Sequence, residues 1–487
     1  MSFIFNYSMI IIVSYCLIVL LLGIIGYKKR EKGSLSDFYL AGRDMGLVVL
    51  FFTLFATQYS GNSLIGFSAK TYRSGFLFIC SVTFMVAIVG AYLMYAPKLY
   101  KISRREGLIT IGDYLNFRFK SPLLSNIAVL IVVFVLSSYI LTNLKAIGYV
   151  IEMVSGGAIS FVWAIIGASI IMLVYETLGG MRSVAWTDVL QGVILMIGCI
   201  VLFLVIIMQY GNLEAASEVL KNSQPHILEV PRLPQLFRWM SILIFFPFSI
   251  AIYPHAIQRI FAARSKKTLK RSFQVMLCMP LVTTLLIFII GILGIAYFPG
   301  LNKLESETII MKILIDIVHN MPSMQWLITL FVCAVISAIM STVDSALLSI
   351  SSAFIKDLTG QFEHNIPQKR LIFFGKIFAW IIMGVLVYLA IYLPNTIWHL
   401  IKIKLEVLFQ LTPAIFLGIN LPKISTQSIL TGLIMGLLTV MLLQIFSIHF
   451  EMIQNGMIAI VVNLFFVFSV YLIGLHRKRG GLSYEAN

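Results

Sequence analysis

Thirteen apolar segments, most of them long enough to cross a lipid bilayer, follow one another along this 487-residue chain. A membrane-spanning helix needs about 20 mostly apolar residues. The segments lie at 8–27, 47–69, 76–98, 123–153, 159–178, 184–209, 236–262, 272–298, 324–355, 371–393, 405–420, 427–447 and 456–475. A bilayer offers no water to unpaired backbone groups, so such spans are predicted to be α-helices. The sequence therefore predicts an all-α polytopic membrane protein with about 13 transmembrane helices, folded as a single membrane domain over 1–487.

Charged residues are scarce and unevenly placed. Only 11% of the residues are charged and 60% are hydrophobic, which excludes a soluble enzyme, a disordered protein and a fibre. The net charge of +16 would suggest a nucleic-acid surface in a soluble protein. Here, however, 26 of the 36 Lys and Arg residues fall in loops after odd-numbered spans, at one helix end or in the C-terminal tail, and only 9 in the other loops. This bias predicts a bacterial-type inner (plasma) membrane protein with its N-terminus outside and its C-terminus cytoplasmic, whose partner is the lipid bilayer and not nucleic acid.

Two of the predicted spans are interrupted by residues that do not suit a continuous helix. The second turns polar in mid-membrane, and the seventh contains two prolines. These stretches read Ala56-Thr57-Gln58-Tyr59-Ser60-Gly61-Asn62-Ser63, Phe246-Pro247-Phe248-Ser249 and Tyr253-Pro254-His255. A small-residue packing seam and an ordinary proline kink are the simpler alternatives. The five-span spacing between the interruptions instead favours two inverted repeats with a binding site between them.

The repeats would divide the domain into an extra N-terminal helix at 8–27, repeat 1 at 47–209, repeat 2 at 236–420 and two C-terminal helices at 427–475. We expect a solute to bind where the broken spans meet, because irregular backbone persists at membrane depth only where it lines a cavity or is buried in protein. The candidate solute ligands are Gln58, Ser60, Asn62, Phe248 and Ser249. A half-helix N-terminus at such a break suits an anionic solute.

Two of the 20 acidic residues, Asp188 and Asp344, lie where solvation is costly. Intramembrane acids usually mark a pathway or a site, although an interfacial cap and a buried hydrogen-bonding partner are the respective alternatives. Close to Asp344, the consecutive hydroxyls of Ser341 and Thr342 offer two hard oxygens to one small cation, and the carbonyl of Ala338 lies one turn earlier. The alternative is that these hydroxyls bond back to their own helix.

Several motifs, taken in order, resemble the solute:sodium symporter family. They are Phe38-Tyr39-Leu40-Ala41-Gly42-Arg43, Gly179-Gly180-Met181-Arg182 before Trp186-Thr187-Asp188, Gln258-Arg259, and Ser341-Thr342. The resemblance spans roughly residues 8–475, and its motifs are specific only when taken together. It points to the bacterial branch whose members carry pantothenate, proline or carboxylates.

This resemblance implies a LeuT-like fold, a five-plus-five inverted repeat, with sodium bound between the second and ninth spans. The sodium ligands would be the carbonyls of Ala56, Tyr59 and Ala338 and the hydroxyls of Ser341 and Thr342. A second sodium, as some relatives bind, would use Asp188, Asp344 and Ser345. Proline carriers have an Asp where this chain has Gln58, so their coupling pattern does not transfer unchanged.

The predicted function is sodium-coupled import of a small organic solute by alternating access, with sodium as the coupling ion and no catalytic or cofactor-binding residues. The solute would be an organic anion, such as pantothenate or a monocarboxylate, or an amino acid such as proline. A transporter-like sensor that binds solute without moving it is the alternative. An intramembrane enzyme lacks a nucleophile motif, and a channel lacks a filter segment. The oligomeric state is left open, and a monomer is compatible with the sequence.

Overall fold

The computed structural model describes residues 2–29, 33–229, 231–358, 366–393, 397–448, 450 and 453–481. Over these residues the chain is helical, and its one β contact is an isolated bridge between Met45 and Ala263. The first part holds α1 (Ser2–Lys28), α2 (Leu35–Leu40), α3 (Leu47–Gln58), α4 (Gly61–Ser74), α5 (Cys80–Glu106), α6 (Ile111–Phe119), α7 (Pro122–Val154), α8 (Phe161–Gly179), α9 (Met181–Tyr210) and α10 (Leu213–Ser223).

The second part continues with helices of similar character. They are α11 (Leu233–Ile250), α12 (Pro254–Ala262), α13 (Lys266–Met276), α14 (Met279–Val282), α15 (Thr284–Tyr297), α16 (Lys303–Ser306), α17 (Ile309–Asn320), α18 (Trp326–Ala353), α19 (Gln368–Tyr392), α20 (Ile397–Phe409), α21 (Thr412–Asn420), α22 (Thr426–Ile445) and α23 (Asn455–Gly481). All thirteen predicted segments are thus found as helices.

Twelve helical stretches within the described ranges are long and apolar enough to cross a membrane. The count differs from thirteen because the predicted span 47–69 is divided into α3, which is too short to cross alone, and α4, which runs on toward α5. The predicted span 236–262 is likewise divided into α11 and α12. The chain is therefore a multi-pass membrane protein.

The first break has a clear local cause. α3 ends at Gln58, and Tyr59 takes an extended conformation with φ −100° and ψ 106°. Ser60 then caps α4, because the Ser63 amide donates to the Ser60 carbonyl at 2.8 Å and the Ser60 amide donates to the Ser63 hydroxyl at 3.3 Å. Small hydroxyl side chains favour such caps over a continuing helix.

The second break lies later than the first proline. α11 continues through Pro247 to Ile250, and the chain turns at Ala251–Tyr253 before α12 begins at Pro254. A proline at the first position of a helix has no amide hydrogen to leave unpaired, so it suits the start of α12. The predicted interruption is therefore confirmed at Tyr253-Pro254, while Pro247 lies inside a helix.

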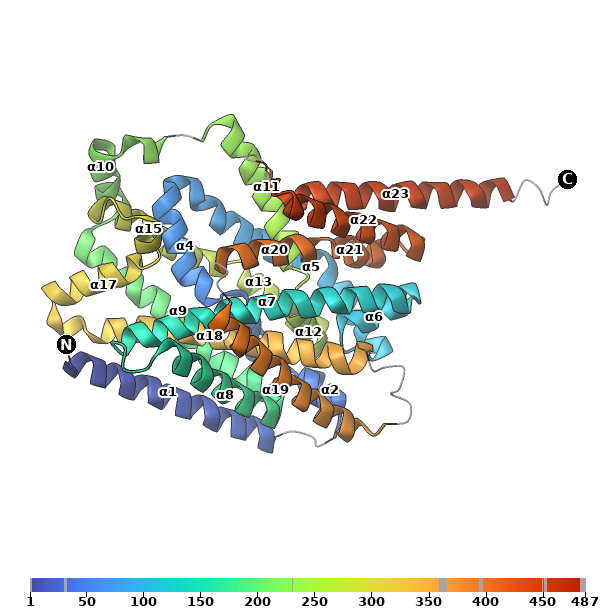
Figure 1. Ribbon diagram of the computed structural model, residues 1–487, viewed down its shortest axis with the longest axis horizontal. Coiled ribbons are helices and arrows are strands. Elements are labelled where there is room, and N and C mark those ends of the chain that lie inside the picture. Colours follow the sequence, from blue (N-terminus) through green and yellow to red (C-terminus); the bar gives the residue numbers. More distant parts are fainter. Residues whose placement is uncertain are drawn as a thin grey trace.

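Most long helices run roughly along the long axis of the molecule, and the start of α1 and the end of α23 lie at opposite ends of that axis (Figure 1). The short helices α10 and α17 lie at the end where the N-terminus lies (Figure 1). α18 lies deepest: from Val332 to Ala353 every residue is buried, and it packs against α3, α7 and α9. A helix that is buried all round is the place where polar side chains need partners from the protein.

Two of the sequence motifs meet where α2 packs against the start of α9. Arg182, just after the start of α9, donates to the Asp37 carboxylate of α2 at 2.6 and 2.8 Å. Gly180 has φ +59°, and a Cβ there would collide with the carbonyl oxygen of Phe38. The glycine pair is therefore needed to bring the start of α9 against α2.

Candidate functional site at the helix breaks

The end of α3 presents backbone carbonyl groups next to α18. In an unbroken helix the Ser60 amide would bond the Ala56 carbonyl, but here it donates to the Ser63 hydroxyl. The last carbonyls of a helix lack partners within the helix and are free to bind other groups. The Tyr59 amide still donates to the Phe55 carbonyl at 3.2 Å. The break therefore supplies carbonyl oxygens in the region where Ala56 and Tyr59 were predicted to bind sodium.

The predicted ligands on α18 have two different orientations. The Thr342 hydroxyl donates to the Ala338 carbonyl at 2.8 Å, so these two oxygens lie together. The Ser341 hydroxyl donates to Asp188 at 2.5 Å. The Thr57 hydroxyl near the end of α3 lies 3.2 Å from the Ser345 hydroxyl on α18, and a Cβ on Gly61 would lie 2.5 Å from the Ile339 side chain. The α3–α4 break and the middle of α18 are therefore neighbours.

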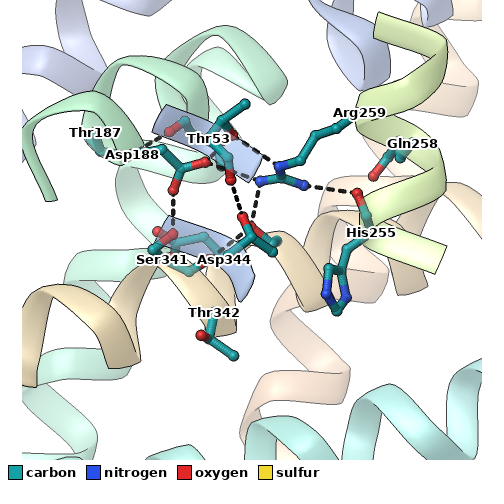
Figure 2. Close-up of polar contacts among 12 residues, drawn as sticks. Thr53, Thr187, Asp188, His255, Gln258, Arg259, Ser341, Thr342 and Asp344 are labelled. Atoms are coloured by element: carbon teal, nitrogen blue, oxygen red, sulfur yellow. Dashed lines mark hydrogen bonds and ion pairs between the residues drawn. The ribbon is translucent and has the colours of Figure 1, made fainter. Parts of the chain in front are cut away.

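An ion pair buried in the middle of the protein joins α9 to α12. The Arg259 guanidinium lies 3.0 Å from the Asp188 carboxylate, and both side chains are 0% exposed. The second carboxylate oxygen accepts the hydrogen bond from Ser341, and the Thr53 hydroxyl on α3 also donates to this carboxylate. These side chains come from α3, α9, α12 and α18 and point toward one another (Figure 2). Burial of this kind is tolerable only when both charges are paired and hydrogen-bonded.

Arg259 uses the rest of its donors on the same cluster. Its Nε donates to the Thr53 hydroxyl at 2.9 Å, and a terminal nitrogen donates to the His255 carbonyl at 3.0 Å. The other terminal nitrogen, which pairs with Asp188, also donates to the Ser345 hydroxyl. The guanidinium thus contacts two residues predicted as ligands of a second sodium, Asp188 and Ser345.

The role of Arg259 was missed by the sequence reasoning, which treated it only as part of a motif. The available signal was a basic residue on the seventh span and a lone acid, Asp188, on the sixth. The third predicted ligand, Asp344, turns toward α8, where it accepts a hydrogen bond from the Tyr175 hydroxyl. Ser345 donates to the carbonyl of Ser341 at 2.7 Å. Asp188 and Ser345 thus share Arg259 as a partner, whereas Asp344 bonds Tyr175.

A cavity of about 1510 Å³ lies beside the breaks. Gln58 and Ser60, two of the predicted solute ligands, line it. Phe248 and Ser249 are not among its lining residues, because Phe248 packs edge-on against Phe416 and Ser249 donates to its own helix. The structure does not describe the side chain of the fifth predicted residue, Asn62.

The sequence profile of the sodium:solute symporter family matches residues 38–436. The chain belongs to the sodium:solute symporter family. The matched range begins within α2 and ends within α22, so it includes both helix breaks, the buried ion pair and the cavity.

Individual relatives of this symporter agree with the family assignment. It is 28% identical over 446 residues to the sodium/pantothenate symporter of Haemophilus influenzae, which covers 88% of this chain and 89% of the relative. It is 25% identical over 467 residues to the high-affinity proline transporter PutP of Bacillus subtilis, covering 92% and 95%. These relatives are transporters.

The fold is also that of a solved sodium symporter. A Na⁺-coupled sialic acid symporter, captured substrate-bound and outward-open, superposes with a TM-score of 0.78 at 19% identity, covering 96% of this chain and 97% of that one. The predicted LeuT-like architecture is thereby confirmed. The symporter described here couples sodium to the import of a solute.

Proposed function

We propose that this symporter imports a small organic solute by alternating access, with sodium bound between the α3–α4 break and α18. The proposed ligands are the carbonyls of Ala56, Tyr59 and Ala338 and the hydroxyls of Ser341 and Thr342. The observation that carries the proposal is the break itself. It releases carbonyl oxygens of α3 at the level where two hydroxyls of α18 lie.

Sodium at this position would hold α3 to α18 while the site is open to the outside. Its loss to the cytoplasm would allow the two repeats, 47–209 and 236–420, to rock against each other. One charge moving through 100 mV releases about 2.3 kcal/mol, which supports roughly a 50-fold solute gradient. The charge bias of the loops supports an outside N-terminus and a cytoplasmic C-terminus. We also propose that Asp188, Asp344 and Ser345 form a second cation-binding group. In this conformation the Arg259 guanidinium contacts two of its members, Asp188 and Ser345.

The solute is proposed to bind in the cavity, with Gln58 and Ser60 among its ligands. Two classes are supported by the relatives: an organic anion, since one relative is a pantothenate symporter, and an amino acid, since another is a proline transporter. Transport distinguishes this function from a solute sensor, because a sensor would bind solute and produce no flux.

Counterflow of labelled pantothenate and labelled proline in proteoliposomes tests the proposal. We expect uptake of one solute in sodium buffer and little in potassium buffer. Replacing both sodium-site hydroxyls, with Ser341→Ala and Thr342→Ala together, is expected to abolish the sodium dependence. As a control, Thr439→Ala removes a hydroxyl on α22 that bonds the Met435 carbonyl of its own helix at 2.8 Å, and it is expected to leave uptake unchanged. Uptake that ignores sodium would refute the proposal.

A further inference from the structure

The cavity beside the helix breaks is lined by more positive than negative side chains. Among the described residues its charged lining consists of Lys145, Arg259, Lys303, Lys402, Lys404, Glu152 and Glu307. Both acids already have partners. Glu307 pairs with Arg73 at 2.8 Å, and the Glu152 carboxylate accepts the Phe161 amide at 3.1 Å.

Lys404 is the charge in this lining that most needs an explanation. Its side chain is only 2% exposed, and it lies on α20 with Nζ 3.6 Å from the ring centre of Tyr139. Across the described ranges no carboxylate forms an ion pair with it. The acid two positions later on α20, Glu406, instead accepts a hydrogen bond from Gln444 on α22 at 2.7 Å.

A buried ammonium of this kind is costly unless another group balances it. The Tyr139 ring supplies a cation–π contact, which offsets part of that cost. It cannot supply a negative charge. Arg259 differs in this respect, because its charge is matched by Asp188 at 3.0 Å. The cavity therefore contains a buried positive charge whose counter-charge is not provided by the neighbouring side chains.

Two further polar groups of the lining have no hydrogen-bond partner among the residues that the structure describes. Both the amide oxygen and the amide nitrogen of Gln58 are buried without a hydrogen bond, and so is Nδ1 of His255. His255 stacks on Tyr139 with ring centres 6.0 Å apart, so it lies beside the ring that Lys404 contacts. Buried polar groups are nearly always hydrogen-bonded. Polar groups without hydrogen bonds that line the same cavity indicate that a polar ligand binds there.

We propose that the solute is an organic anion bearing a carboxylate, and that Lys404 holds its negative charge, with Gln58 and His255 bonding its polar groups. This inference rests on the proposed function and selects one of its two solute classes. A zwitterion such as an amino acid fits less well, because its ammonium group would meet a lining with five basic side chains and two acids, one of which, Glu307, is already paired with Arg73. The rest of the lining, such as Phe246, Ile250 and Phe331, suits an apolar body.

Thermal unfolding of the purified full-length protein in detergent tests the inference, in sodium chloride buffer of constant ionic strength. The probes are pantothenate, its uncharged alcohol counterpart pantothenol, pyruvate, proline and iodide. We expect pantothenate or pyruvate to raise the melting temperature, and pantothenol, proline and iodide to have no effect. The inference would be overturned if proline or iodide alone shifted the melting temperature, or if neither pantothenate nor pyruvate did.

Variants of Lys404 then test whether this residue binds the negative charge of the solute. In Lys404→Met the affinity for the active carboxylate is expected to fall about 10- to 100-fold, while stabilisation by sodium relative to potassium is retained. Lys404→Arg keeps the positive charge and should recover part of the affinity, and it replaces the methionine variant if that one does not fold. Lys312→Gln on α17, outside the cavity lining, is the control for loss of a positive charge.

The two proposals fail in different ways. If carboxylate binding is unchanged in Lys404→Met, the role of Lys404 is refuted while sodium-coupled uptake still stands. If uptake of every probe is the same in sodium and in potassium, the proposed coupling fails instead, whatever the melting temperatures show.

Discussion

The buried pair of Asp188 and Arg259 gives the sharpest test of how the centre of this symporter is stabilised. Both side chains are 0% exposed and 3.0 Å apart. Asp188→Asn leaves the guanidinium without a counter-charge, and Arg259→Met leaves the carboxylate without one. Breaking a buried pair by removing one partner typically costs about 3–5 kcal/mol. We expect each single variant to lose stability in this range.

The double variant separates the charge interaction from the general cost of substitution. With Asp188→Asn and Arg259→Met combined, no unpaired charge remains, and replacing a whole buried pair is often nearly neutral. Ser341 and Thr53 donate to different oxygens of Asp188. An asparagine keeps one acceptor oxygen, so it can still accept from one of these hydroxyls, while its amide NH2 faces the other as a donor. The two single losses sum to roughly 6–10 kcal/mol. We therefore expect the double variant to lose clearly less than this sum, with a coupling energy of at least about 3 kcal/mol.

The assay is unfolding of the detergent-purified protein in sodium-free potassium buffer. Sodium must be absent because Asp188 also belongs to a proposed cation-binding group, and ion binding would add its own stabilisation. Arg232→Met is the control: it removes an arginine that is 80% exposed and 3.6 Å from Glu229, so no measurable change is expected. Losses that simply add in the double variant would refute the reasoning.

Two further predictions concern helix contacts. A Cβ on Gly61, the first residue of α4, would lie 2.5 Å from the Ile339 side chain on α18. Gly61→Ala should therefore reduce sodium-dependent uptake in proteoliposomes, and adding Ile339→Ala should restore part of that uptake. A double variant with no recovery would contradict a steric cause. Asp37 is buried and paired with Arg182 at 2.6 Å; Asp37→Asn should cost about 1–3 kcal/mol of unfolding free energy, measured by thermal unfolding, and an unchanged melting temperature would contradict this.

Much of the fold could be predicted from the sequence, because membrane depth limits what an apolar run can become. The spans were found by length, and the break after Gln58 by polar residues where lipid allows none. The break before α12 was found through its prolines, but Pro247 gave a misleading signal. A proline inside a membrane helix can be accommodated by neighbouring groups, and only the surrounding helices decide whether the chain turns there.

The partners of the buried charges could not be predicted. The predicted span at 405–420 starts beside three charged residues, Lys402, Lys404 and Glu406, because a charge is normally a sign of a helix end. In the structure α20 continues through these residues. Glu406 is 0% exposed and bonded to Gln444, and Lys404 lies over an aromatic ring. Which face of a helix meets a cavity depends on packing between distant segments, and hydropathy carries no record of it.

The position of Arg259 bears on how sodium acts in this protein. Its guanidinium contacts α3 and α9 from the first half of the chain and Ser345 of α18 from the second, while Arg259 itself lies on α12. The guanidinium is part of the chain, so the loss of sodium does not remove this positive charge from between the two halves. Ser341 bonds the same ion pair through Asp188, and its neighbour Thr342 bonds the Ala338 carbonyl. A sodium ion bound at these two hydroxyls would therefore act beside the contact that Arg259 makes between the two halves in this conformation, at the point where a small change in α18 affects both halves.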